Sequence, residues 1–172
     1  AGDCGIGHVR YSTFGTSNLR NVQPLVVDYA KGSMAVAHNG NLTNAALLRE
    51  ELEAAGAIFQ STTDSEVIIH LISRSRKEDF TECVIDALRQ LVGSYSVVIF
   101  NGESLVAARD PHGFRPLWLG RLDDAYVVAS ETCAFDIIDA DWIREIEPGE
   151  VVTITRHRAH SVKPFPQVTP KQ

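Results

Sequence analysis

Two potential hydrogen-bond donors lie side by side in the stretch Ala35 to Leu42, which reads Ala-Val-Ala-His-Asn-Gly-Asn-Leu. Its apolar start predicts a short strand, and the pair Asn39 and Gly40 predicts a polar turn that leads into a helix and not into a return strand. The Asn39 amide and the Gly40 N–H would then be free to bind the oxygen of a carbonyl under attack, as in an oxyanion hole. The alternative is an ordinary turn, in which Gly supplies a positive φ and Asn tolerates one.

Two charged residues could bind the ends of a free amino acid. Arg10 lies on an alternating stretch that predicts a strand over 5–11, and its buried guanidinium needs an anionic partner. That partner is either a carboxylate of the chain or the carboxylate of a ligand, gripped by two hydrogen bonds. Asp64 lies at the predicted start of a helix, where it either complements the helix dipole or binds a ligand ammonium. Together the two residues match the two charged ends of an amino acid.

The elements that position these residues follow from periodicity and turn signals. Strands are expected at 25–29, 33–38, 95–100, 104–108, 117–120, 126–130 and 150–155. Helices are expected at 43–55, at 64–73, after a Thr81 cap, and at 132–138. Strands before and after a central run of helices predict an α+β fold with sheets packed against helices, not a parallel βαβ series.

Composition excludes several classes of protein. A chain of 172 residues with 44% hydrophobic residues fits one globular domain, and a net charge of −6 argues against nucleic-acid binding. No apolar run approaches the length of a membrane span, so no membrane partner is expected. The three cysteines are widely spaced and odd in number, which indicates a reducing compartment, the cytoplasm, with no disulfide framework and no metal site.

Three motifs, in this order, resemble the glutamine-hydrolysing domain of class II amidotransferases: His8 to Thr13, His38 to Leu42, and Thr63 to Glu66. Two later runs, Arg109 to Leu117 and Val128 to Asp136, narrow the resemblance to the amidophosphoribosyltransferase family. The resemblance covers Gly5 to about Thr155. It implies an N-terminal-nucleophile hydrolase fold of the αββα type, incomplete at its N-terminus.

The resemblance also implies roles for the residues. Arg10, helped by Thr13, would grip the α-carboxylate of glutamine, and Asp64 would bind its α-ammonium. Asn39 and the N–H of Gly40 would form the oxyanion hole. In the family, an N-terminal cysteine attacks the glutamine amide, with its own α-amino group as base, to give a thioester and ammonia. The ammonia passes to a second, Mg²⁺-dependent domain, where it displaces pyrophosphate from phosphoribosyl pyrophosphate in the first step of purine synthesis, and the parent enzyme is expected to be a homo-oligomer.

The nucleophile does not fit this pattern. Residue 1 is Ala, and the first cysteine is Cys4, followed by Gly and Ile as family nucleophiles are. Residues 5–13, however, resemble the arginine strand, which in the family lies tens of residues downstream of the nucleophile. We therefore do not expect Cys4 to be catalytic, and we expect Cys83 and Cys133 to be structural.

Truncation at both ends would explain the departure. On this interpretation residues 1–155 form the amidotransferase domain without its nucleophile segment, and residues 156–172 form a linker toward an absent phosphoribosyltransferase domain. The fragment alone is then expected to be inactive, with no cofactor of its own. Two alternatives are another class II amidotransferase, such as the glucosamine-6-phosphate synthase type or the asparagine-forming type, and a non-catalytic glutamine-binding module.

Overall fold

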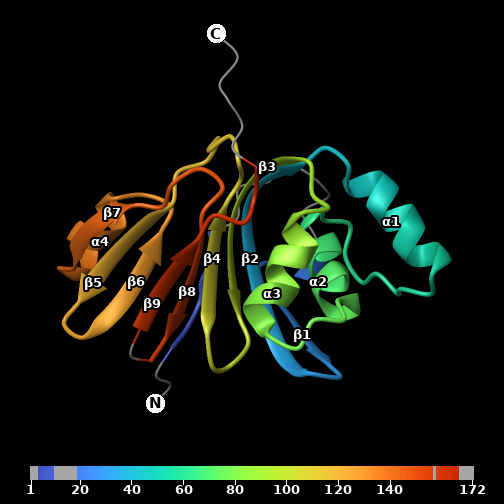
Figure 1. The fold of residues 1–172 in the computed structure, drawn as a ribbon, viewed down its shortest axis with the longest axis horizontal. Coiled ribbons are helices and arrows are strands. Elements are labelled where there is room, and N and C mark those ends of the chain that lie inside the picture. The colour runs from blue at the N-terminus through green and yellow to red at the C-terminus, as the bar shows by residue number, and fades with distance from the viewer. Residues whose placement is uncertain (1–3, 10–18, 157, 167–172) are drawn as a thin grey trace, which may run out of the picture.

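Two antiparallel β-sheets and a set of helices make up the computed structural model, which describes residues 4–9, 19–156 and 158–166. Figure 1 shows the arrangement. A short 3₁₀ helix at Leu19–Asn21 precedes the first strand. The strands are β1 (Leu25–Tyr29), β2 (Gly32–Leu42), β3 (Gly93–Phe100), β4 (Leu105–Arg109), β5 (Trp118–Leu122), β6 (Ala125–Ala129), β7 (Asp141–Glu145), β8 (Val151–Thr155) and β9 (Arg158–Val162). The helices are α1 (Ala45–Ala54), α2 (Ser65–Arg74), α3 (Phe80–Leu88) and α4 (Cys133–Ile138).

Four layers result from the packing of these elements. A six-stranded sheet, in the order β1-β2-β3-β4-β8-β9, carries α1, α2 and α3 on one face (Figure 1). Its other face packs on a three-stranded sheet, in the order β6-β5-β7, through alternate side chains such as Leu105 and Leu119. Gly120, next to Leu119, faces the outer side of the small sheet, where Phe135 of α4 covers it. The predicted αββα architecture is confirmed.

Strand β2 is longer than the sequence predicted. It runs through Asn39 and Gly40 to Leu42 and pairs with β3 along this length, from Ala35 opposite Phe100 to Leu42 opposite Gly93. The predicted turn at Asn39 and Gly40 is therefore wrong. Local turn propensity loses here to a long ladder of hydrogen bonds with a neighbouring strand.

Helix positions agree with the sequence better than helix caps do. Helix α1 buries Ala45, Leu48 and Leu52. Gly56, with φ +93°, ends α1 in a Schellman motif: its N–H donates to the Glu53 carbonyl and the Ala57 N–H to the Leu52 carbonyl. The predicted cap of α3, Thr81, is wrong. Asp79 caps this helix by accepting a hydrogen bond from the N–H of Glu82, since α3 begins at Phe80, two residues earlier than a Thr81 cap implies.

Two strands were not predicted, and one predicted strand is absent from the part of it that the structure describes. Strand β7 pairs with β5, and β9 pairs with β8 over Arg158–Val162, so the six-stranded sheet extends beyond the predicted domain end at residue 155. Both strands lie at sheet edges and are mostly exposed, so they carry no apolar alternation for a sequence pattern to detect. In the predicted strand at 5–11, the described residues 4–9 form no strand, since no described strand pairs with them.

Candidate active site

A cavity of about 800 Å³ lies where β2, the N-terminal end of α2 and the small sheet meet. Three of the five predicted site residues line it: Asn39, Gly40 and Asp64. Thr63 lines it as well, and so do Gly7, His8 and Val9. The other two predicted residues, Arg10 and Thr13, lie outside the described residues.

Asn39 and Gly40 reach the cavity from the middle of the sheet. They lie opposite Ser96 and Tyr95 in the ladder between β2 and β3. A Cβ atom at Gly40 would be 2.1 Å from the carbonyl oxygen of Ser94, far inside contact distance. Because β3 passes so close, only glycine fits at this position in this wall of the cavity.

Asp64 is tied to the same strand. Its Oδ2 accepts a hydrogen bond of 2.9 Å from the backbone N–H of Leu42, at the end of β2. Its Oδ1 has only longer contacts among the described residues, 3.5 Å to Ser65 Oγ and 4.0 Å to His38 Nδ1. The residue is 8% exposed and makes no side-chain capping bond to α2. A buried carboxylate that does not cap its helix is better explained by a cationic ligand than by the helix dipole.

His38 was not predicted as a site residue, although it directly precedes Asn39. Its ring is buried, and Nδ1 lies 3.0 Å from the Ser65 hydroxyl. Burial lowers the pKa of His38; the Asp64 carboxylate and the Ser94 carbonyl oppose this shift, and the nearby His8 adds to it. Among the described residues, a neutral imidazole leaves the Asp64 carboxylate without a cationic partner. The signal in the sequence was a polar residue on an otherwise apolar strand.

Gln23 forms hydrogen bonds with both His38 and Ser65. Its Oε1 accepts a hydrogen bond of 2.7 Å from the His38 N–H, and its Nε2 donates one of 3.3 Å to the Ser65 hydroxyl. The loop before β1, strand β2 and helix α2 are thereby connected through buried hydrogen bonds at the cavity wall. These bonds fix Asn39 and Asp64 relative to each other.

The motif from Arg109 to Leu117 forms the loop that borders the other side of the cavity. The buried Arg109 guanidinium donates to the carbonyls of Gly113, Arg115 and Ile146 and to the Glu145 carboxylate, 2.7 Å away. This loop brings Arg115 and Leu117 to the cavity. Arg109 thus holds the loop in place through these hydrogen bonds and does not itself line the cavity.

The three cysteines are free thiols. Cys83 is buried in α3, as expected of a structural residue, while Cys133 is exposed and lines the cavity next to the small sheet. Cys4 is exposed. No helix among the described residues has the length and apolar content that a membrane crossing needs.

The cavity combines features that suit an amide carbonyl attached to an amino acid. A side-chain amide and a glycine backbone lie on one rigid wall, and a carboxylate with one weakly bonded oxygen lies beside them. The first pair could bind a developing oxyanion, and the carboxylate could bind an ammonium.

Known proteins match the chain closely. A protein-family model described as a glutamine amidotransferase domain matches residues 8–136. The chain is 50% identical over 172 residues to amidophosphoribosyltransferase 2, chloroplastic, of Arabidopsis thaliana, which covers 99% of this chain and 31% of that protein. It is 49% identical over 150 residues to the amidophosphoribosyltransferase of Bacillus subtilis, which covers 87% of this chain and 32% of that protein. The chain therefore spans about a third of the length of the curated relatives it matches.

Solved structures agree. The glutamine phosphoribosylpyrophosphate amidotransferase from B. subtilis, complexed with ADP and GMP, superposes with a TM-score of 0.86 at 44% identity, over 92% of this chain and 34% of that chain. A glutamine aminotransferase class-II domain protein from Silicibacter pomeroyi, 22% identical over 77% of this chain and 67% of that chain, superposes with a TM-score of 0.56 and shares the fold.

Proposed function

Because the chain belongs to the family of glutamine amidotransferase domains, we propose that its cavity binds glutamine and supports the release of ammonia from the side-chain amide. The observation that carries the proposal is that Asn39, Gly40 and Asp64 line one cavity although Gly40 and Asp64 lie 24 positions apart in the sequence. The resemblance found in the sequence assigns the oxyanion to Asn39 and Gly40, the α-ammonium to Asp64, and the α-carboxylate to Arg10 and Thr13.

The proposed reaction is attack of a cysteine thiolate on the amide carbon of glutamine. The carbonyl oxygen becomes an oxyanion held by the Asn39 amide and the Gly40 N–H. The amide nitrogen takes up a proton and leaves as ammonia, which gives a thioester, and water then hydrolyses the thioester to glutamate. We propose that the thiol comes from a cysteine outside the 172 residues, as the family resemblance implies, and not from Cys4.

The relatives suggest where the ammonia goes. Those reported above are named amidophosphoribosyltransferases, and the chain matches about a third of their length. We propose that the ammonia reacts with phosphoribosyl pyrophosphate in a second, Mg²⁺-dependent domain of a homo-oligomeric parent enzyme. The parent would form 5-phosphoribosylamine, the first step of purine synthesis. The free thiols support a reducing compartment, for which we propose the cytoplasm.

The substitution Asp64→Asn tests the proposal. The Asn side chain can still accept the hydrogen bond from Leu42, so the fold is expected to survive, but the charge that binds the ammonium is lost. In the parent enzyme, glutamine-dependent activity should fall at least about a hundredfold, while activity with free ammonia should stay within about twofold. Glu53→Gln, a half-exposed carboxylate on α1, serves as the matched control.

Three results would redirect the assignment. Equal loss of both activities in Asp64→Asn would refute the proposed role of the cavity. Glutamine binding in calorimetry, without ammonia release by the verified full-length protein, would identify a binding module. Ammonia transfer to a sugar phosphate or to aspartate, but not to phosphoribosyl pyrophosphate, would identify another class II amidotransferase.

A further inference from the structure

The loop at residues 60–63 leads to the cavity, which Thr63 lines, and it contains no strand or helix. Each of its four backbone N–H groups nonetheless donates to a side chain. The N–H groups of Gln60 and Ser61 donate to the two carboxylate oxygens of Glu66, each at 2.7 Å. The N–H of Thr62 donates to Asn21 Oδ1 at 3.0 Å, and the N–H of Thr63 donates to Ser61 Oγ at 3.3 Å. Side chains therefore satisfy the backbone N–H groups of this loop, as a neighbouring strand does in a sheet.

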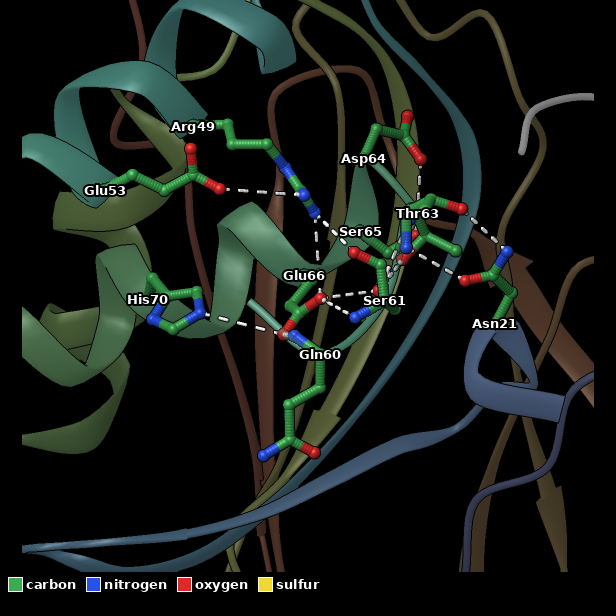
Figure 2. Close-up of polar contacts among 11 residues, drawn as sticks. Asn21, Arg49, Glu53, Gln60, Ser61, Thr63, Asp64, Ser65, Glu66 and His70 are labelled. Atoms are coloured by element: carbon green, nitrogen blue, oxygen red, sulfur yellow. Dashed lines mark hydrogen bonds and ion pairs between the residues drawn. The ribbon is translucent and has the colours of Figure 1, made fainter. Parts of the chain in front are cut away.

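Glu66 is the centre of this arrangement (Figure 2). The hydroxyl of Ser61 also donates to Glu66 Oε2, at 2.6 Å, and its oxygen lies 2.9 Å from the hydroxyl of Thr63. Three of the four loop N–H groups thus depend on Glu66, two directly and one through Ser61. Thr63 and Glu66 have the spacing of a capping box, in which a glutamate accepts a hydrogen bond from the residue three positions before it. Glu66 instead accepts hydrogen bonds from the N–H groups of Gln60 and Ser61.

Arg49 and His70 flank the carboxylate of Glu66. Arg49 of α1 lies 3.8 Å from Glu66 and donates to the carbonyl of Ser61 at 2.6 Å. Its guanidinium lies 4.0 Å from the ring centre of Phe59, and the ring of His70, 3.8 Å from Glu66, packs against the same Phe59. Figure 2 shows Arg49 and His70 reaching Glu66 from two helices. The nearby His70 ring and the hydrogen bonds from the loop hold the pKa of Glu66 at about 2, against the effect of burial.

We propose that Glu66 is a positioning residue for glutamine, which fixes the loop at 60–63 and thereby holds Thr63 and Asp64 at the cavity wall. Glu66 does not line the cavity, so it acts through the loop and not by contact with the ligand. The inference rests on the proposed function only where it names glutamine. The fixing of the loop stands on the contacts of Glu66 alone.

The substitution Glu66→Gln removes the negative charge of the side chain and keeps its size and shape. Both carboxylate oxygens accept from backbone N–H groups, so either orientation of the amide places its NH₂ group against a donor. Glu53→Gln is the matched control, because Glu53 also pairs with Arg49, at 3.9 Å, but does not touch the loop. Circular dichroism and urea unfolding of the 172-residue chain would establish that each variant folds.

Two measurements on the same chain test the proposal. Hydrogen exchange of the Gln60 and Ser61 amides should become at least about tenfold faster in Glu66→Gln, and the dissociation constant for glutamine, measured by calorimetry, should rise at least about tenfold. Glu53→Gln should match the parent chain in both. Wild-type amide protection in a folded Glu66→Gln would overturn the proposal, and so would unchanged glutamine affinity in a variant with a loosened loop.

The design separates this proposal from the proposed function. If the unsubstituted chain did not bind glutamine, the proposed function would fail, and amide exchange alone would decide whether Glu66 holds the loop. If Glu66→Gln did not fold, Ser61→Ala would replace it, since that change removes a single hydroxyl from the same arrangement. Ser61→Ala should then speed exchange at Thr63 and weaken glutamine binding a few-fold, and a variant that matches the parent chain would contradict the inference.

Discussion

Replacing Glu150 by Gln should destabilise the fold by about 3 kcal/mol at neutral pH. The carboxylate is buried and accepts hydrogen bonds from both Arg144 Nη atoms, at 2.7 and 2.8 Å, and from the backbone N–H of Glu147 at 2.7 Å. The hydroxyl of Ser161 donates to it as well. These contacts join β7, the following loop, β8 and β9, and they hold the pKa of Glu150 at about 2, with the Arg144 hydrogen bond the largest opposing effect to burial.

The magnitude follows from linkage between protonation and folding. The difference between the ordinary Glu pKa of 4.5 and a folded value of about 2 is equivalent to about 3 kcal/mol of stability when the unfolded chain is fully ionised. Since the folded pKa is the lower one, the stabilisation is fully present above about pH 4.5 and is lost as the pH falls toward 2. At pH 3 the same values leave the carboxylate about 1 kcal/mol.

Urea unfolding followed by circular dichroism at pH 7 and at pH 3 would measure this. Glu150→Gln should lose about 3 kcal/mol at pH 7, or about 6–12 °C in Tm for a chain of this length, and much less at pH 3. Glu147→Gln is the control, because its carboxylate is 59% exposed, pairs with Lys163, and should change stability by less than about 1 kcal/mol. A Glu150→Gln effect of equal size at both pH values would refute the reasoning.

Three further substitutions test the backbone. Gly40→Ala places a Cβ 2.1 Å from the Ser94 carbonyl oxygen, so urea unfolding should show a loss of about 3 kcal/mol or more; an effect below about 1 kcal/mol would mean that β2 and β3 are less closely spaced. Gly120→Ala places a Cβ 2.6 Å from the Phe135 ring and should lower stability by about 1–3 kcal/mol, with a neutral result counting against the packing of α4. Asp139→Gly should instead raise the Tm by a few degrees, because Asp139 has φ +55° at the end of α4; a lower Tm would show that its side chain stabilises the turn.

The layers of the fold could be predicted because they depend on local periodicity. The spacing of Val67, Ile68, Leu71 and Ile72, for example, predicts the buried face of α2. The pair Asn101 and Gly102 predicts the hairpin of β3 and β4. The second Asn-Gly pair of the chain does reverse the chain, with Asn101 Oδ1 accepting from the N–H groups of Glu103 and Ser104. The first pair does not, because β3 supplies hydrogen-bond partners that lie more than 50 residues away.

The candidate site could be predicted only in part, for a similar reason. Residue types and order identified Asn39, Gly40 and Asp64, and the cavity brings these three together. His38 and Gln23 were not identified because their hydrogen bonds join segments far apart in the sequence. No local pattern marks a glutamine such as Gln23, before the first strand, as the partner of a helix residue.

The eight-pair ladder from Ala35 to Leu42 has a consequence for how any ligand is accepted. Asn39 and Gly40 lie within this ladder, so this wall of the cavity cannot move toward a ligand. Its conformational entropy is lost when the chain folds and not when the ligand binds. Any conformational change on binding is therefore expected in the segments that flank this wall. Ligands whose shape does not match the wall should not bind.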